Sequence, residues 1–128
     1  MRGEMKVLII DDEEDTRQIC SMSLGLIGGD QVLEAASGQE GLALAADQQP
    51  DVIILDLIMP DMDGAETLQK LRQNPDTAGI PVIFLTVKGM FSEFERLKSL
   101  GALAVLTKPF DPVQLSAQIQ GILNAAKA

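Results

Sequence analysis

The sequence predicts an α/β fold in which helices cover both faces of a parallel five-stranded sheet. Five short apolar runs recur along the 128 residues, and segments with helix-like patterns separate them. Runs such as residues 52–55 are continuously apolar rather than alternating, which is typical of strands buried on both sides. The predicted strands are residues 6–10, 31–35, 51–55, 81–85 and 103–106.

The starts of two helices are marked by capping chemistry. Ser37 is followed three residues later by Glu40. Asp63 is followed at the same spacing by Glu66. Both pairs resemble capping boxes, in which side-chain oxygens accept hydrogen bonds from the free N–H groups of the first turn. We therefore expect helices to begin just after Ser37 and Asp63.

Proline and glycine mark further helix boundaries. Asp111 followed by Pro112 predicts the N-cap and first turn of the last helix, because that position needs no N–H donor. Gly28-Gly29 and Gly101 lie where the first and fourth helices should end, since glycine tolerates the positive φ that is common there. The chain is therefore expected to alternate strand and helix five times.

The composition excludes several classes of function. Ten basic and nineteen acidic residues give a formal net charge of −9, which repels phosphates, so direct binding of nucleic acid is not expected. The sequence has no histidine, which excludes histidine-based catalysis and the common zinc sites. No apolar run approaches the roughly 18 residues that cross a bilayer, and the N-terminal region is acidic, so neither membrane association nor export is expected.

The length and the single cysteine fit one cytoplasmic domain. A chain of 128 residues can bury one sizeable core. Cys20 cannot form an internal disulfide, which fits a reducing compartment. Its helical spacing with Leu24 and Ile27 predicts a small core residue rather than a reactive thiol.

Polar side chains follow four of the five predicted strands. They are Asp11 and Asp12 after the first strand, Asp56 after the third, Thr86 after the fourth and Lys108 after the fifth. The carboxyl ends of parallel strands meet at one edge of the sheet, where ligands bind in open α/β folds. One pocket can therefore collect all five side chains.

These residue types favour phosphoryl transfer to a carboxylate. Three carboxylates brought together repel one another, so a cation must compensate them. Carboxylate oxygens without histidine or cysteine select magnesium, manganese or calcium, and room for water and a phosphate oxygen suits magnesium best. An ammonium and a hydroxyl complete a site complementary to a transferring phosphoryl group. The predicted chemistry is the formation of an aspartyl phosphate on Asp56.

The ordered motifs resemble the receiver domain of two-component response regulators, the CheY-like family. The resemblance runs from Met5 to about Leu123. Each motif alone is weak, but the ordered set with these spacings is specific. The motifs are Asp11-Asp12, Asp56, Met59-Pro60, Asp63-Gly64, Thr86 and Lys108-Pro109-Phe110.

The resemblance implies both the architecture and the roles of the site residues. It implies a doubly wound, flavodoxin-like three-layer sandwich with strand order 2-1-3-4-5. Asp56 would be the phosphoacceptor. Asp12 would bind Mg²⁺ directly and Asp11 through water, with Asp56 and the main-chain carbonyl of Ile58 as further ligands, and Mn²⁺ is a possible substitute.

Thr86 and Lys108 would each contact a phosphoryl oxygen, according to the same resemblance. Thr86 would shift toward the phosphoryl group on phosphorylation. The Lys108–Pro109 peptide bond would be cis, which an X-Pro bond allows.

The resemblance also implies partners and domain organisation. A sensor histidine kinase or a phosphotransfer protein would supply the phosphoryl group. The face formed by the fourth helix, fifth strand and fifth helix would bind a downstream protein or a second copy of the chain. We expect one receiver domain over residues 1–128, with a core at about 5–123 and no output domain. It would be a signalling switch that catalyses its own phosphorylation, rather than an enzyme with turnover.

Two departures from the family pattern affect the outgoing signal. Val105 occupies the position on the last strand where the family usually has an aromatic ring, so we expect signalling through the Thr86 loop and the fourth helix instead. Phe91 lies off the apolar stripe of that helix and is a candidate exposed anchor for a partner. Ile58 and Lys88 flank the site without a water-positioning carboxylate or amide, which predicts slow self-dephosphorylation.

Three alternatives to this function differ in what they require of the sequence. A flavin protein would place a phosphate-binding loop after the first strand, where this chain is acidic. A haloacid-dehalogenase-type phosphatase would need a second aspartate at position 58, which is isoleucine. A pseudo-receiver that signals without phosphorylation remains as the alternative, although all five site residues are present.

Overall fold

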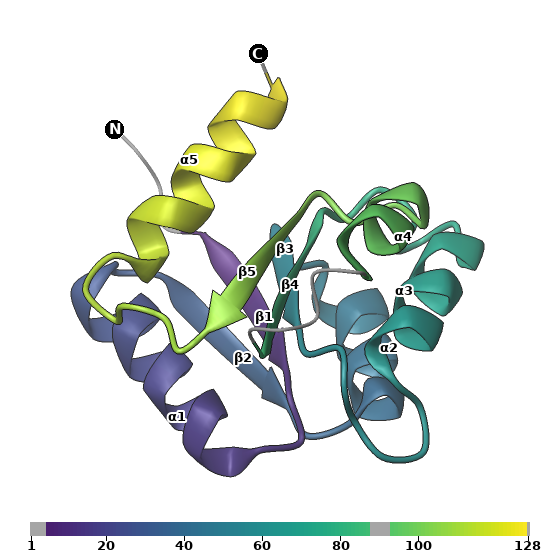
Figure 1. Cartoon of the computed structure of the whole chain (residues 1–128), viewed down its shortest axis with the longest axis horizontal. Coiled ribbons are helices and arrows are strands. Elements are labelled where there is room, and N and C mark those ends of the chain that lie inside the picture. The colour runs from purple at the N-terminus through teal and green to yellow at the C-terminus, as the bar shows by residue number, and fades with distance from the viewer. Residues whose placement is uncertain (1–4, 88–92, 128) are drawn as a thin grey trace.

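The computed structural model describes residues 5–87 and 93–127 and has three layers, with a central parallel sheet between two layers of helices (Figure 1). The strand order is β2-β1-β3-β4-β5, which confirms the order implied by the family resemblance. The strands are β1 (Lys6–Ile10), β2 (Gln31–Ala35), β3 (Val52–Leu55), β4 (Val82–Val87) and β5 (Ala104–Lys108).

Helices pack on both faces of the sheet, as the continuously apolar strands predict (Figure 1). Helices α1 and α5, with the π-helical turn η1, pack on one face through Cys20, Leu24 and Ile119. Helices α2, α3 and α4 pack on the other face. The described helices are α1 (Glu14–Met22), η1 (Ser23–Ile27), α2 (Gly38–Gln48), α3 (Gly64–Gln73), α4 (Phe94–Ser99) and α5 (Leu115–Lys127).

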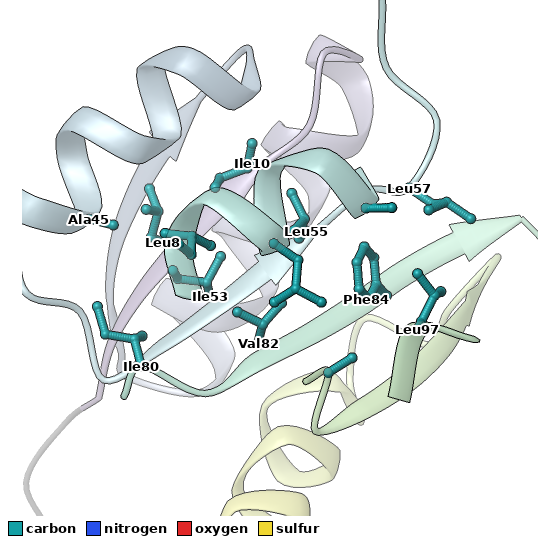
Figure 2. Close-up of a cluster of buried hydrophobic side chains, with 14 of the residues drawn as sticks. Leu8, Ile10, Ala45, Ile53, Leu55, Leu57, Ile80, Val82, Phe84 and Leu97 are labelled. Carbon is teal, nitrogen blue, oxygen red and sulfur yellow. The ribbon is translucent and has the colours of Figure 1, made fainter. Parts of the chain in front are cut away.

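Alternating side chains of the central strands build two separate cores. In β1, Leu8 and Ile10 point to the face covered by α2 and α3, whereas Val7 and Ile9 point to the face covered by α1 and α5. All four are essentially inaccessible to solvent. Figure 2 shows the first core, in which Phe84 of β4 lies among the aliphatic side chains. The loops at the strand ends therefore rest on a sheet that is packed on both faces.

The ends of two strands differ from the prediction in a way that matters for the site. β4 extends to Val87 and β5 to Lys108, so Thr86 and Lys108 lie within strands rather than after them. Both are held in the ladder, where Thr86 is opposite Thr107 and Val87 is opposite Lys108. A strand continues past its last apolar residue as long as the main chain forms hydrogen bonds with the neighbouring strand, whatever the side chain.

The predicted capping interactions at α2 and α3 are present. Ser37 Oγ accepts a hydrogen bond from the Glu40 N–H at 3.1 Å, and the Glu40 carboxylate accepts one from the Ala36 N–H at 2.7 Å. At α3, Asp63 Oδ1 accepts a hydrogen bond from the Glu66 N–H at 2.9 Å. These bonds satisfy N–H groups that have no partner within the helix.

The predicted start of α5 is one turn too early. Asp111 Oδ1 accepts a hydrogen bond from the Val113 N–H at 2.9 Å, and the Asp111 carbonyl accepts one from Gln114 at 3.0 Å. Asp111 therefore stabilises a separate turn, and the helix itself begins at Leu115. Apolar periodicity does not distinguish a turn that continues into a helix from the helix itself.

The predicted ends of the first and fourth helices are supported by backbone conformation, with φ of 73° at Gly29 and 113° at Gly101. Cys20 is buried as predicted, and so is Leu24, whereas Ile27, at the same helical spacing, has 55% of its surface exposed. The Gly28 N–H donates to the carbonyl of Ser23, five residues earlier, at 3.1 Å. This wider π-type turn rotates Ile27 away from the buried stripe.

One peptide bond and the length of the helices can also be compared with the sequence predictions. The Lys108–Pro109 peptide bond is cis, as the family resemblance implies. Within residues 5–87 and 93–127, no helix combines the length and apolar character that a transmembrane span requires.

Candidate functional site

Asp56 lies immediately after β3, where the strand enters the loop at the carboxyl edge of the sheet. Its side chain is almost completely buried, with 7% of the residue exposed, and its N–H donates to the Ile10 carbonyl at 3.0 Å. The loop then passes so close to Gly64 that a β-carbon there would lie 2.3 Å from the Asp56 carbonyl oxygen. The glycine at the start of α3 therefore fixes the path of the main chain that carries Asp56.

Asp11 and Asp12 follow the neighbouring strand β1 and bring two more carboxylates to the same place. One carboxylate oxygen from each of Asp11, Asp12 and Asp56 lies within 4.8 Å of the other two. Asp11 is buried and its Oδ1 accepts a hydrogen bond from the Glu13 N–H at 2.9 Å, whereas Asp12 is exposed. The three residues from two adjacent strands thus form a small acidic cluster with one open side.

Lys108 at the end of β5 supplies the positive charge of the cluster. Its Nζ donates to Asp11 Oδ2 at 3.0 Å and lies 3.5 Å from Asp56 Oδ1. Burial lowers the pKa of Lys108, but the hydrogen bond to Asp11 and the charges of Asp56 and Asp11 outweigh burial and raise it overall. Lys108 therefore remains charged at neutral pH and binds two of the three carboxylates.

Thr86 presents a buried hydroxyl to this site. Among the described residues, its Oγ1 is the buried side-chain oxygen for which no hydrogen-bond partner is found. An unsatisfied buried polar group costs about 1–3 kcal/mol. A ligand oxygen in the pocket would supply an acceptor for this hydroxyl.

A cavity of about 320 Å³ joins these groups. Ile58, predicted to offer its main-chain carbonyl, borders the cavity and has 57% of its surface exposed. The carboxylate set and the open side fit a hard divalent cation that keeps some of its water. The structure thus brings all six predicted site residues to one edge of the sheet. The cavity is lined by Asp12, Glu13, Asp56, Ile58, Thr86, Val87 and Lys108.

The ionisation of Asp56 reflects its crowded position. Burial raises its pKa most, the Asp11 charge raises it further and Lys108 opposes both, with a net result of about 6 compared with an ordinary value of 3.8. Burial is therefore the main reason that Asp56 resists ionisation, and the neighbouring Asp11 charge adds to it. A bound cation would favour the ionised form of Asp56, which is the form able to act as a nucleophile.

The comparison with known families identifies this arrangement. A family model described as the response regulator receiver domain matches residues 7–120. The chain belongs to this family. Receiver domains are the signalling switches of two-component systems rather than classical enzymes.

Individual relatives support the assignment at the level of sequence. The "Probable chemotaxis protein CheY" of Rhizobium etli is 36% identical over 124 residues, which cover 97% of this chain and 96% of that protein. The "DNA-binding dual master transcriptional regulator RpaA" of Synechocystis sp. is 40% identical over 119 residues, covering 93% of this chain. The receiver chain spans only 49% of RpaA, so it corresponds to about half of that longer protein.

Solved structures agree with the fold. The chemotaxis response regulator CheY4 of Vibrio cholerae has a TM-score of 0.85 at 35% identity, covering 94% of this chain and 99% of that chain. A putative response regulator from Chloroflexus aurantiacus has a TM-score of 0.87 at 32% identity, covering 95% of this chain and 99% of that chain. This receiver therefore has the CheY-like flavodoxin fold.

Phe91, the candidate partner anchor, and Lys88, the flanking residue, both lie outside the described residues.

Cys20 is fully buried, and burial together with the Asp11 charge raises the pKa of its thiol to about 12, which fits an unreactive core residue.

Sequence reasoning missed Arg17, which contacts the Asp11 main chain from α1. An arginine on a helix surface gives no sequence signal for such a contact.

The raised pKa of Asp56 has a measurable consequence in the metal-free protein. Ionising Asp56 opposes folding, because its folded pKa of about 6 lies above the ordinary 3.8, so stability is lost as pH rises through that window. Asp56→Asn should therefore raise the midpoint of thermal unfolding at about pH 8 and lose most of that gain at about pH 4. Calorimetry in a chelating buffer measures both midpoints.

The exposed Asp76 provides the matched control, because Asp76→Asn makes the same chemical change away from the site. It should alter neither midpoint appreciably. An equal gain for Asp56→Asn at both pH values, or a lower midpoint at the higher pH, would contradict the assignment of burial and crowding as the cause.

Proposed function

We propose that this receiver is switched by Mg²⁺-dependent phosphorylation of Asp56, with the phosphoryl group supplied by a histidine kinase or a phosphotransfer protein. The observation that supports this most directly is the unsatisfied Thr86 hydroxyl facing the same cavity as Asp56 and Lys108. A core polar group without a partner is costly in a purely structural module. It is expected where a phosphoryl oxygen completes the site.

Each residue has a distinct part in the proposed reaction. An oxygen of Asp56 attacks phosphorus and forms the new P–O bond, while the bond from phosphorus to the donor breaks and the donor leaves with the electron pair. Lys108 and Thr86 bind the phosphoryl oxygens on which negative charge accumulates. Mg²⁺, held by Asp11, Asp12, Asp56 and the Ile58 carbonyl, would neutralise charge on the carboxylates and on the phosphoryl group.

A small phosphodonor tests this chemistry without a kinase. Incubation with acetyl phosphate and Mg²⁺ should add one phosphoryl group to the protein, as measured by intact mass spectrometry. Asp56→Asn should abolish the addition, because the amide is not a nucleophile, and chelation of Mg²⁺ should slow it by more than about a hundredfold. No mass increase in the unsubstituted protein would instead favour a pseudo-receiver that signals without phosphorylation.

We further propose that the outgoing signal uses α4, β5 and α5. Val105 and Thr107 lie on the same face of β5, and Thr107 is directly opposite Thr86 in the ladder. Val105 is partly buried and packs against the core beneath α4. A groove of about 390 Å³ beside it is lined in part by Phe94 and Phe110. A shift of Thr86 would therefore reach α4 without a ring flip on β5.

Beryllofluoride with Mg²⁺, which mimics the phosphoryl group, provides the test of this route. Amide signals of Leu97 in α4 and Val105 in β5 should move in heteronuclear NMR spectra, while those of the distant Leu44 in α2 should not. Binding of beryllofluoride with the Leu97 and Val105 signals unmoved would contradict the proposed route.

We propose that the phosphodonor protein docks on α1, η1 and the turn before α5. Exposed apolar side chains gather there, with Ile19 47%, Met22 59%, Leu26 80% and Val113 62% exposed. Ser23 Oγ donates to the Pro112 carbonyl, which holds the turn against η1. A groove of about 430 Å³, lined by Ile19 and Lys108 among others, continues this surface to the site. A protein partner would bury the apolar surface as it delivers phosphorus to Asp56.

Comparing protein and small-molecule donors separates docking from chemistry. Ile19→Asp should slow phosphotransfer from the cognate kinase or phosphotransfer protein by about tenfold, because it places a charge in a desolvated contact. The rate with acetyl phosphate should not change. The control Ala43→Asp makes a similar change on the exposed face of α2 and should affect neither rate. Equal slowing with both donors would argue that Ile19 acts on the site itself.

A further inference from the structure

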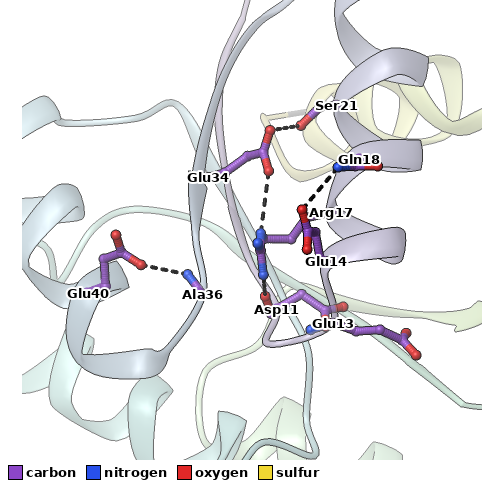
Figure 3. Close-up of polar contacts among 9 residues, drawn as sticks. All are labelled: Asp11, Glu13, Glu14, Arg17, Gln18, Ser21, Glu34, Ala36 and Glu40. Carbon is purple, nitrogen blue, oxygen red and sulfur yellow. Dashed lines mark hydrogen bonds and ion pairs between the residues drawn. The ribbon is translucent and has the colours of Figure 1, made fainter.

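Arg17 of α1 reaches from the helix surface back to the main chain of the acidic loop (Figure 3). Its Nη1 donates to the Asp11 carbonyl at 2.8 Å, and its Nε forms an ion pair with Glu34 Oε1 at 3.4 Å. Glu34 is held in turn by Ser21 Oγ, which donates to Oε2 at 2.7 Å. Only 16% of the Arg17 side chain is exposed. The guanidinium thus joins α1, β2 and the loop after β1.

Few other hydrogen bonds fix the main chain of the loop that carries Asp11 and Asp12, between β1 and α1. The side chain of Glu13, the N-cap residue of α1, accepts no hydrogen bond from a backbone N–H of the first turn and is bonded instead by the Thr16 hydroxyl. Within the described part of the chain, no hydrogen bond to the Asp12 side chain is found, so the position of that carboxylate depends on its main chain. The Asp11 N–H is fixed by the Ala35 carbonyl at 3.1 Å. The Asp11 carbonyl is fixed by Arg17.

We propose that Arg17 is a positioning residue for the divalent-cation site. By holding the Asp11 carbonyl, it fixes the peptide that links Asp11 to Asp12 and so keeps both carboxylates within reach of Asp56. This inference rests on the proposed function, in which these carboxylates bind Mg²⁺. Outer partners of metal ligands commonly govern affinity by fixing ligand orientation, and their loss weakens binding about 10–100-fold.

Arg17 acts through geometry rather than through its charge. Glu34 compensates the guanidinium charge, so little of it is left to offset the carboxylate cluster. The planar guanidinium directs N–H groups to two acceptors at once, here a carbonyl and a carboxylate on different elements. The ammonium of lysine has the same charge but lacks the planar arrangement of N–H donors that holds two acceptors at once. Lysine at position 17 is therefore not expected to replace arginine.

Mg²⁺ affinity, measured by isothermal titration calorimetry with magnesium chloride, tests the proposal. Arg17→Ala and Arg17→Lys should each raise the dissociation constant by about tenfold relative to the unsubstituted protein. Gln18→Ala truncates the next side chain of α1, whose hydrogen bond is to Glu14, and should leave affinity unchanged. In the metal-free protein, the Glu13 amide, which donates to Asp11, should exchange with solvent faster in both Arg17 variants than in Gln18→Ala.

The outcomes separate this inference from the function on which it rests. Failure of the unsubstituted protein to bind Mg²⁺ would overturn the proposed function and the role of Arg17 together. Normal binding with unchanged affinity in Arg17→Ala would overturn the role of Arg17 alone. Full affinity in Arg17→Lys would show that charge, not geometry, is what matters, and would overturn the proposal as stated.

A milder variant keeps the test available if the Arg17 variants do not fold. Glu34→Gln removes the ion pair but keeps an acceptor of similar shape, so it should weaken Mg²⁺ binding by about threefold. Circular dichroism establishes that the variant is folded before titration. Affinity equal to that of the unsubstituted protein in a folded Glu34→Gln variant would overturn the proposal.

Discussion

Electrostatic crowding at the carboxyl edge of the sheet is the constraint on which the site depends. Asp11, Asp12 and Asp56 place carboxylate oxygens within 4.8 Å of one another, and Lys108 is the cation bound directly to two of them. Burial raises the pKa of Asp56 most, the Asp11 charge raises it further, and Lys108 opposes both, so the carboxylate is costly to ionise where it lies. A divalent cation held as proposed would favour the ionised carboxylates, so metal binding and ionisation of the nucleophile would be coupled.

The fold supplies the rigidity that such a crowded site needs. Like charges separate unless the main chains that carry them are fixed, and here the strands are packed on both faces. The close approach of Gly64 to the Asp56 carbonyl leaves no room for the loop to retreat. Arg17 restrains the opposite wall by holding the Asp11 carbonyl. The favourable packing of side chains over the whole sheet thus offsets the repulsion among the three carboxylates.

Sequence reasoning predicted the convergence of these side chains, because their positions along the strands carry that information. Residues at the ends of parallel strands must converge, so Asp56, Asp11 and Lys108 were predictable from the apolar runs alone, while the strand order needed the family resemblance. Features that depend on side-chain conformation or on helix pitch could not be predicted from the sequence. The π-type turn exposes Ile27 against its apolar pattern, and the contact of Arg17 with Asp11 depends on a side chain folding back along its own helix.

Under the proposed function, the packing of Val105 affects how a change at the site would travel outward. A ring at this position could respond to Thr86 by changing its rotamer, but a β-branched side chain packed against the core has little such freedom. Thr86 and Thr107 are paired across β4 and β5, and Val105 lies two residues before Thr107 on the same face of β5. Displacement of Thr86 would therefore have to be accommodated by the packing between β5 and α4. Under the proposed function, the switch would be a shift of α4 against β5, with the apolar contact at Val105 between them.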